Sequence, residues 1–179
     1  MSGGEGEMVS PDPGRETTDG FNAMPESEAR QQLSACCDSA TWVDTILAGR
    51  PYADLPTLIE TADGAARRLS AAEVEHAVRT HPRIGQQAEG QSMQSAWSRS
   101  EQSGVDDDEE TRQELVLANR EYERRFDRVF LICAAGLSAE QILTALRARL
   151  DNDTATEQAV VADEFRKIAL RRLRRVVAV

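Results

Sequence analysis

Apolar positions recur every three or four residues along most of the chain, which is the spacing of amphipathic helices. Alternation of apolar and polar residues is nearly absent, and only 4% of the residues are aromatic. The pattern predicts an all-α protein, a single compact bundle of about seven to nine helices. The expected helices cover residues 25–37, a short stretch ending at 49, 55–69, 70–81, 93–103, a long candidate within 105–136, a helix opening at 138, and 154–177.

Helix ends are marked by capping residues. Ser70 precedes Glu73 by three positions, and Ser138 precedes Gln141 by three, so each pair predicts a capping box at a helix start. Pro82 disfavours the α conformation for the residue before it, so the helix that starts after Ser70 is expected to end near residue 81.

Composition adds a boundary and excludes some classes of partner. Residues 1–24 are rich in Gly, Pro, Ser, Thr and Glu, which predicts a disordered acidic tail before a helical domain at 25–179. The formal charge of -10 disfavours nonspecific binding to nucleic acid. No apolar run approaches a membrane span, and the first residues lack the apolar core of a signal peptide. We therefore expect a cytoplasmic protein without a membrane or nucleic-acid partner.

The three cysteines do not suggest a disulfide framework. Their number is odd, and Cys36 and Cys37 are adjacent, so these two do not readily bridge to each other. Together with Cys133 they are best interpreted as small buried apolar residues in a reducing compartment.

His81 is one of only two histidines in the chain. It is expected at a helix C-terminus, where the partial negative charge favours the imidazolium form, and a nearby carboxylate would raise its pKa further. Either effect would give an acid usable near neutral pH. A polar helix-end residue without a chemical role is the alternative. His76 lies five residues away, off the same helical face, which argues against a paired metal site.

A second polar group comes from the predicted helix at 93–103. Ser98, Glu101 and Gln102 are spaced i, i+3 and i+4 and share one helical face. A hydroxyl, a carboxylate and an amide on one face can hold a polar heterocycle by its N–H and C=O groups. The alternative is an ordinary solvated helix face.

The last helix carries an arginine on its apolar side. Arg172 follows Phe165 by seven residues and Ile168 by four, so it points into the buried sector, whereas Arg171 lies toward the polar side. A buried arginine is costly unless an anion meets it, which makes Arg172 a candidate carboxylate ligand. Arg149 repeats the pattern on the preceding helix. For both, an internal salt bridge or a side chain reaching out to solvent is the alternative.

The apolar stretch at residues 130–136 is normally interpreted as core. It ends in small residues, and a chain that loosens at Gly136 could also expose backbone donors to a ligand.

Five segments together resemble a known family. They are "LSACCDSATWVDTILAGRPY", "HPRIG", "SAWSRSEQSG", "FDRVFLICAAGLSAEQILTALRARLDND" and "KIALRRL", in this order and spacing. They resemble the 2-oxo-4-hydroxy-4-carboxy-5-ureidoimidazoline (OHCU) decarboxylases, which catalyse the last step from urate to (S)-allantoin. The resemblance covers about residues 21–177. It implies an all-helical enzyme without cofactor or metal, which often forms homodimers.

The resemblance also implies roles for individual residues. The family's catalytic histidine, glutamate and arginine fall on His81, Glu101 and Arg172, with Arg171 as the alternative register for the arginine. Its substrate-binding residues match Pro82, Ser98, Gln102 and the backbone of Phe130, Leu131, Ile132, Cys133 and Ala134. The residues leave open whether His81 or Glu101 donates the proton.

Two other functions fit parts of the sequence. One is an inactive binding or regulatory module of the same fold, which the joint presence of His81, Glu101 and Gln102 argues against. The other is a basic C-terminal helix that docks on an acidic partner or membrane surface. The net charge of -10 and the position of Arg172 in the apolar sector weaken that interpretation.

Overall fold

The computed structural model describes residues 18–79, 81, 83–84 and 109–177, and across these ranges it contains eight helices and no strand. The prediction of an all-α protein is confirmed. The helices are α1 (Asp19–Ala23), α2 (Glu26–Cys36), α3 (Ala40–Ala48), α4 (Leu55–Arg67), α5 (Ala71–Val78), α7 (Glu109–Phe126), α8 (Ala139–Arg149) and α9 (Thr154–Val177).

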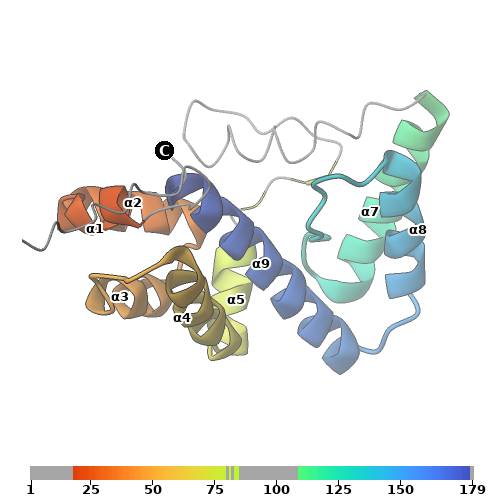
Figure 1. The fold of residues 1–179 in the computed structure, drawn as a ribbon. Helices are drawn as coiled ribbons and strands as arrows, with labels where there is room; N and C mark the ends of the chain where they lie inside the picture. Colours follow the sequence, from red (N-terminus) through yellow and green to blue (C-terminus); the bar gives the residue numbers. More distant parts are fainter. Residues whose placement is uncertain (1–17, 80, 82, 85–108, 178–179) are drawn as a thin grey trace, which may run out of the picture.

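The helices form two groups joined by α9. Helices α1 to α5 gather on one side of the molecule, α7 and α8 pack against each other on the other side, and α9 runs between the groups (Figure 1). Each group has its own apolar core. The first core contains residues of α1 to α5 and the apolar face of α9, and the second contains residues of α7 and α8 with Ile84. The junction between the cores is therefore the place where the groups can share a site.

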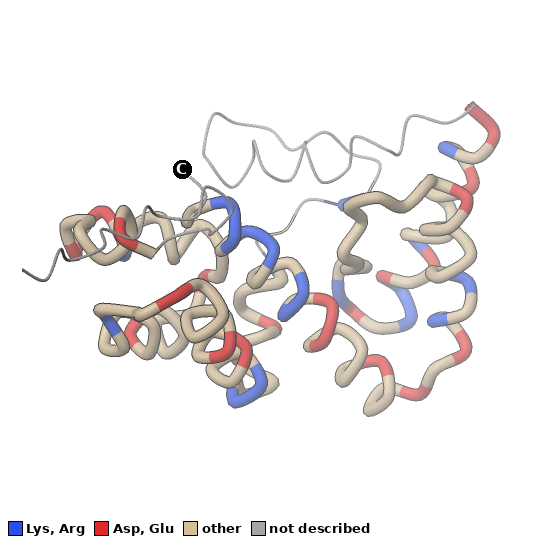
Figure 2. The backbone as a smooth tube through the Cα atoms, viewed as in Figure 1, with Lys and Arg blue, Asp and Glu red and all other residues tan. Residues whose placement is uncertain are grey.

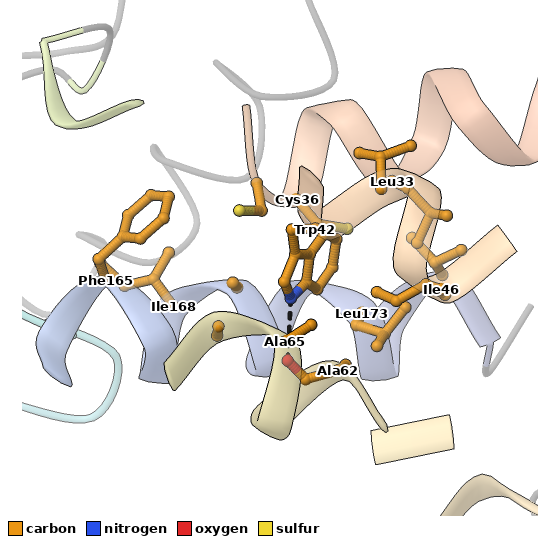
Figure 3. Close-up of a cluster of buried hydrophobic side chains, with 14 of the residues drawn as sticks. Leu33, Cys36, Trp42, Ile46, Ala62, Ala65, Phe165, Ile168 and Leu173 are labelled. Atoms are coloured by element: carbon orange, nitrogen blue, oxygen red, sulfur yellow. Dashed lines mark hydrogen bonds between the residues drawn. The ribbon is translucent and has the colours of Figure 1, made fainter. Parts of the chain in front are cut away.

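Trp42 of α3 is the central side chain of the first core. It is fully buried, and its indole Nε1 donates a hydrogen bond to the carbonyl of Ala62 in α4 at 3.0 Å. Figure 3 shows this bond, with Phe165 and Leu173 of α9 packed in the same cluster. Burying the indole N–H with a partner avoids the cost of an unsatisfied donor, so Trp42 fixes α3 against α4.

Both predicted capping boxes are present. The Ser70 hydroxyl accepts from the N–H of Glu73, whose carboxylate in turn accepts from the N–H of Ser70 at 2.8 Å. Ser138 and Gln141 make the same reciprocal bonds at the start of α8. Because each box satisfies two backbone donors that the helix leaves unpaired, these local sequences determine where α5 and α8 begin.

The charges of α9 follow the direction of the helix dipole. Acidic residues occupy its first half and arginines gather in its second half, as Figure 2 shows. This order places negative charge toward the positive helix end and positive charge toward the negative end. None of the helices in the described part of the chain is long and apolar enough to cross a membrane.

The long candidate helix within 105–136 is shorter than its sequence suggested. Helix α7 ends at Phe126. The next residue, Asp127, has a left-handed φ of 53°, which a right-handed helix cannot contain. Residues 130–134, which we call the pocket segment, are in neither helix nor strand. Leu131 and Cys133 pack on the first core, whereas Phe130, Ile132 and Ala134 lie in the second, the alternation of an extended chain.

The predicted domain boundary at residue 24 is wrong for residues 18–24. Phe21 of α1 is only 2% exposed and packs near the ring of Tyr52. The hydroxyl of Thr18 donates to the carbonyl of Tyr52 at 2.7 Å. The helical domain therefore begins by residue 18, because a short polar stretch is held by tertiary contacts. The rest of the predicted tail and the predicted helix at 93–103 lie outside the described residues.

Candidate active site

His81 lies three residues beyond the end of α5, close to the predicted helix end. Its N–H donates to the carbonyl of Val78 at 3.0 Å, which closes the last turn. The residue is buried, with 9% of its surface exposed, and its ring meets the ring of Phe165 edge to face at a centroid distance of 5.9 Å. Phe165 belongs to α9, so His81 is packed against the helix that joins the two groups.

The chain beyond His81 is anchored to the second group. The guanidinium of Arg83 pairs with the carboxylate of Glu123 in α7 through two nitrogen–oxygen contacts. Ile84 is buried in the second core, and its carbonyl accepts from the Asn119 side chain at 3.5 Å. Contacts to both groups thus place His81 at the junction between the two cores.

Arg172 is also on the inward face of α9, as the spacing predicted. It is 1% exposed, whereas Arg171 is exposed, so the predicted preference for Arg172 as the inward-facing arginine is confirmed. One of its contacts is from Nη1 to the carbonyl of Ala35, at 3.5 Å, in the last turn of α2. The negative end of that helix offsets part of the cost of burying the guanidinium.

His81 packs against α9 at Phe165, and Arg172 lies on the same face of that helix. Phe165, on which His81 packs, precedes Arg172 by seven residues, about 10 Å along a helix. Arginine side chains on a helix lean toward its N-terminus, which directs Arg172 back toward Phe165. The positive charge of Arg172 acts on the imidazole of His81 and lowers its pKa, so the two side chains lie near each other.

The charge state of His81 differs from the sequence-based prediction. Burial and, to a smaller extent, the positive charge of Arg172 together lower the pKa of His81 from 6.5 to about 3. These contacts outweigh the expected effect of the helix end, and Glu101, the carboxylate expected to raise the pKa, lies outside the described residues. At neutral pH the pair consists of a neutral imidazole, able to accept a proton, and a guanidinium that carries the positive charge.

The pocket segment passes between the two cores and is held by side chains. The N–H of Cys133 donates to the carboxylate of Glu164 at 2.7 Å, and the carbonyl of Leu131 accepts from Arg149 at 2.7 Å. Gly136 follows in a turn with φ of 85°, which glycine adopts without strain. The chain has left the helix well before Gly136, because α7 already ends at Phe126.

Arg149 adopts the alternative arrangement that its sequence pattern allowed, an internal salt bridge. Its guanidinium meets Glu157 of α9, which is 0% exposed and also accepts a hydrogen bond from the hydroxyl of Tyr122. Sequence reasoning missed Glu157 and Tyr122. The only local signal at Glu157 is an acidic residue in the first turn of a helix, which the helix dipole already explains.

Four of the residues predicted for the site lie outside the described part of the chain. They are Pro82, Ser98, Glu101 and Gln102. Of the described ones, His81 and the pocket segment lie along the junction between the cores, and Arg172 lies on the inward face of α9 beside the last turn of α2.

Fold and site together define an all-helical protein in which a buried histidine packs on the long last helix, on the face that carries a buried arginine. A family model described as OHCU decarboxylase matches residues 22–174, which is most of the chain. The chain belongs to the OHCU decarboxylase family.

Individual relatives agree with this assignment. The chain is 30% identical over 137 residues to a 2-oxo-4-hydroxy-4-carboxy-5-ureidoimidazoline decarboxylase of Amia calva, covering 74% of this chain and 77% of that protein. It is 26% identical over 160 residues to a uric acid degradation bifunctional protein of Bacillus sp. (strain TB-90), covering 87% of this chain. It spans about a third of the length of that bifunctional relative, 31%.

The fold also matches a solved structure. A crystal structure of OHCU decarboxylase in the presence of (S)-allantoin superposes with a TM-score of 0.71 at 25% sequence identity. The match covers 83% of this chain and 99% of that one.

Proposed function

We propose that this protein decarboxylates OHCU to (S)-allantoin in the breakdown of urate. One observation carries the proposal beyond the family: buried His81 packs on Phe165, on the same face of α9 as buried Arg172. This arrangement offers a proton acceptor and an anion ligand to one small molecule. We propose His81, Glu101 and Arg172 as the catalytic residues.

Arg172 binds the substrate through oxygen atoms. A guanidinium presents a planar fork of N–H donors that matches a carboxylate or a pair of carbonyl oxygens. In a site shielded from water this attraction is stronger than at the surface. Arg172 therefore orients the ring, while Glu101, placed near the leaving carboxylate, favours its departure.

The electron pair left by carbon dioxide needs no external acceptor. When the bond from C4 to the carboxylate breaks, the pair passes into the imidazoline ring and its C=N system. We therefore propose a reaction without cofactor or metal. The remaining work of the protein is to hold the ring and to move protons at defined atoms.

His81 acts as the proton relay. As a neutral imidazole it takes the proton of the 4-hydroxyl group, whose carbon becomes the carbonyl of the product. A proton is then delivered to one face of the neighbouring ring carbon, which makes the product (S) rather than racemic. Binding of an anionic substrate beside His81 partly offsets the charge of Arg172, which favours the protonated form of His81 during turnover.

The remaining contacts hold the heterocycle in place. We propose that Ser98 and Gln102 bind its polar edges, that Pro82 forms part of the pocket wall, and that the backbone of the pocket segment supplies further hydrogen bonds. The support is the match of these residues to the family pattern together with the position of the pocket segment between the cores.

Three further properties are proposed from the same family membership. We propose that the protein acts in the cytoplasm and that it forms a homodimer, and we propose residues 1–17 as a tail outside the catalytic domain. Light scattering of the purified protein in solution measures the subunit number directly. A mass equal to one chain at assay concentration would contradict the dimer.

The test uses the optical activity of the product. OHCU is generated from urate with urate oxidase and hydroxyisourate hydrolase, and the circular dichroism of allantoin is followed after the protein is added. Wild type should produce (S)-allantoin faster than the spontaneous reaction, which gives racemate. His81→Asn should lose most of this rate, whereas His76→Asn, a change at the exposed histidine, should keep it. A wild-type protein without effect on the spontaneous rate would refute the proposed function.

A further inference from the structure

A buried ion pair lies outside the His81–Arg172 site, where α8, α9 and the pocket segment meet. Glu157 is 0% exposed and accepts hydrogen bonds from Arg149 Nε at 2.9 Å, from Asn152 Nδ2 at 2.8 Å, and from the Tyr122 hydroxyl. Buried ion pairs stabilise a fold no better, as a rule, than well-packed apolar side chains of similar size. A geometric role would account for a charged pair at this position.

Arg149 contacts the pocket segment at two consecutive residues. Its Nη1 donates to the carbonyl of Leu131 at 2.7 Å, and its guanidinium carbon lies 4.6 Å from the centroid of the Phe130 ring. The guanidinium is planar, so its bonds to Glu157 determine the direction in which Nη1 points. Through Arg149, Glu157 of α9 thereby fixes the position of the Leu131 carbonyl.

A second carboxylate of α9 holds the same segment. Glu164 accepts from the N–H of Cys133 at 2.7 Å. In an extended chain the C=O of one residue and the N–H of the residue two positions later point to the same edge. Glu157, through Arg149, and Glu164 therefore hold one edge of the segment. Both belong to the helix that also carries Arg172.

We propose that Arg149 and Glu157 are positioning residues, which fix the backbone of the pocket segment relative to Arg172 and so shape the substrate site. This inference rests on the proposed function. Arg149 itself does not touch the substrate. Its loss acts through the segment, which has neither helix nor strand bonds to keep it in place.

The test compares two arginines of α8. Arg149→Lys replaces the fork with a single ammonium, which cannot bridge Glu157 and the Leu131 carbonyl in the same way. We expect KM for OHCU to rise roughly tenfold or more, with a smaller change in kcat, because misplaced binding groups weaken productive binding. Arg147→Lys changes an exposed residue that pairs with Glu114 and should leave both constants unchanged.

A destabilised control separates positioning from folding. Leu115→Ala creates a cavity in the second core, two helical turns before Tyr122, and its loss of unfolding free energy is measured beside that of Arg149→Lys. Positioning predicts that the Leu115→Ala variant keeps the wild-type KM. The inference is overturned if KM rises in both variants in proportion to their loss of unfolding free energy. It is also overturned if Arg149→Lys keeps the wild-type KM.

Two further outcomes are distinguishable. If Arg149→Lys does not fold, the near-isosteric Glu157→Gln replaces it, with the same rise in KM expected and an unchanged KM overturning the inference. A wild-type protein without activity on OHCU would refute the proposed function itself. If the wild type is active and Arg149→Lys leaves its KM for OHCU unchanged, only the positioning role is refuted.

Discussion

The buried, neutral state of His81 has a measurable effect on stability. The free histidine side chain has a pKa near 6.5, whereas burial and then Arg172 lower the pKa of His81 in the fold to about 3. Between these values the unfolded chain binds a proton at this position and the folded chain does not. The free energy of unfolding therefore falls as the pH falls from about 6.5 toward 3. Above about pH 6.5 neither state binds this proton, so His81 causes no loss of stability there.

The size of the effect follows from the pKa difference. One pH unit below the unfolded pKa costs about 1.4 kcal/mol for one such group. At pH 5 the pH is about 1.5 units below the pKa of His81 in the unfolded chain, so the loss of unfolding free energy attributable to His81 is about 2 kcal/mol. For a chain of this length such a loss lowers the melting temperature by about 4–8 °C.

The assay is urea unfolding of wild type and His81→Gln at pH 7 and pH 5. Carboxylates that titrate in this range act in both proteins, so the difference between the two pH-dependent losses isolates His81. We expect the wild type to lose about 2 kcal/mol more than His81→Gln. His76→Gln, which changes an exposed side chain, should behave as wild type. Equal losses in wild type and His81→Gln, or a smaller loss in wild type, would show that folded His81 accepts a proton readily and would refute the reasoning.

Three further perturbations test the roles of Arg172, Trp42 and Phe21. Arg172→Lys should lower kcat/KM for OHCU roughly 100-fold, because one donor fork at the site is lost, whereas Arg171→Lys should keep it; steady-state kinetics decide. Trp42→Phe removes the indole N–H that donates to the Ala62 carbonyl and part of a fully buried ring, and should lower the unfolding free energy by about 1–3 kcal/mol in urea titrations. Deleting residues 1–17 should leave the melting temperature unchanged, while Phe21→Ala in the full chain should cost about 3–5 kcal/mol; equal effects would contradict the corrected domain boundary.

The direction of Arg172 was predictable from sequence because a long helix fixes it. Over the 24 residues of α9, the apolar residues define one face, and a residue seven positions after Phe165 must share it. The same reasoning separated Arg172 from Arg171. Capping boxes at Ser70 and Ser138 were predictable for a similar reason, since their partners lie within three residues.

Features that depend on contacts between distant segments were missed or misjudged. The pKa of His81 follows burial and Arg172, which the local helix end does not reveal. Glu157 resembles an ordinary first-turn acid until Arg149 and Tyr122, from two other helices, are brought to it. Phe21 is a single aromatic residue in a polar stretch, and only its packing near Tyr52 makes it part of the core.

A crystal structure of this protein with (S)-allantoin bound tests the proposed site most directly. We predict that the ring of the ligand lies between the imidazole of His81 and the guanidinium of Arg172, with hydrogen bonds from the backbone of the pocket segment. A ligand bound elsewhere, with neither His81 nor Arg172 within hydrogen-bond distance, would contradict it.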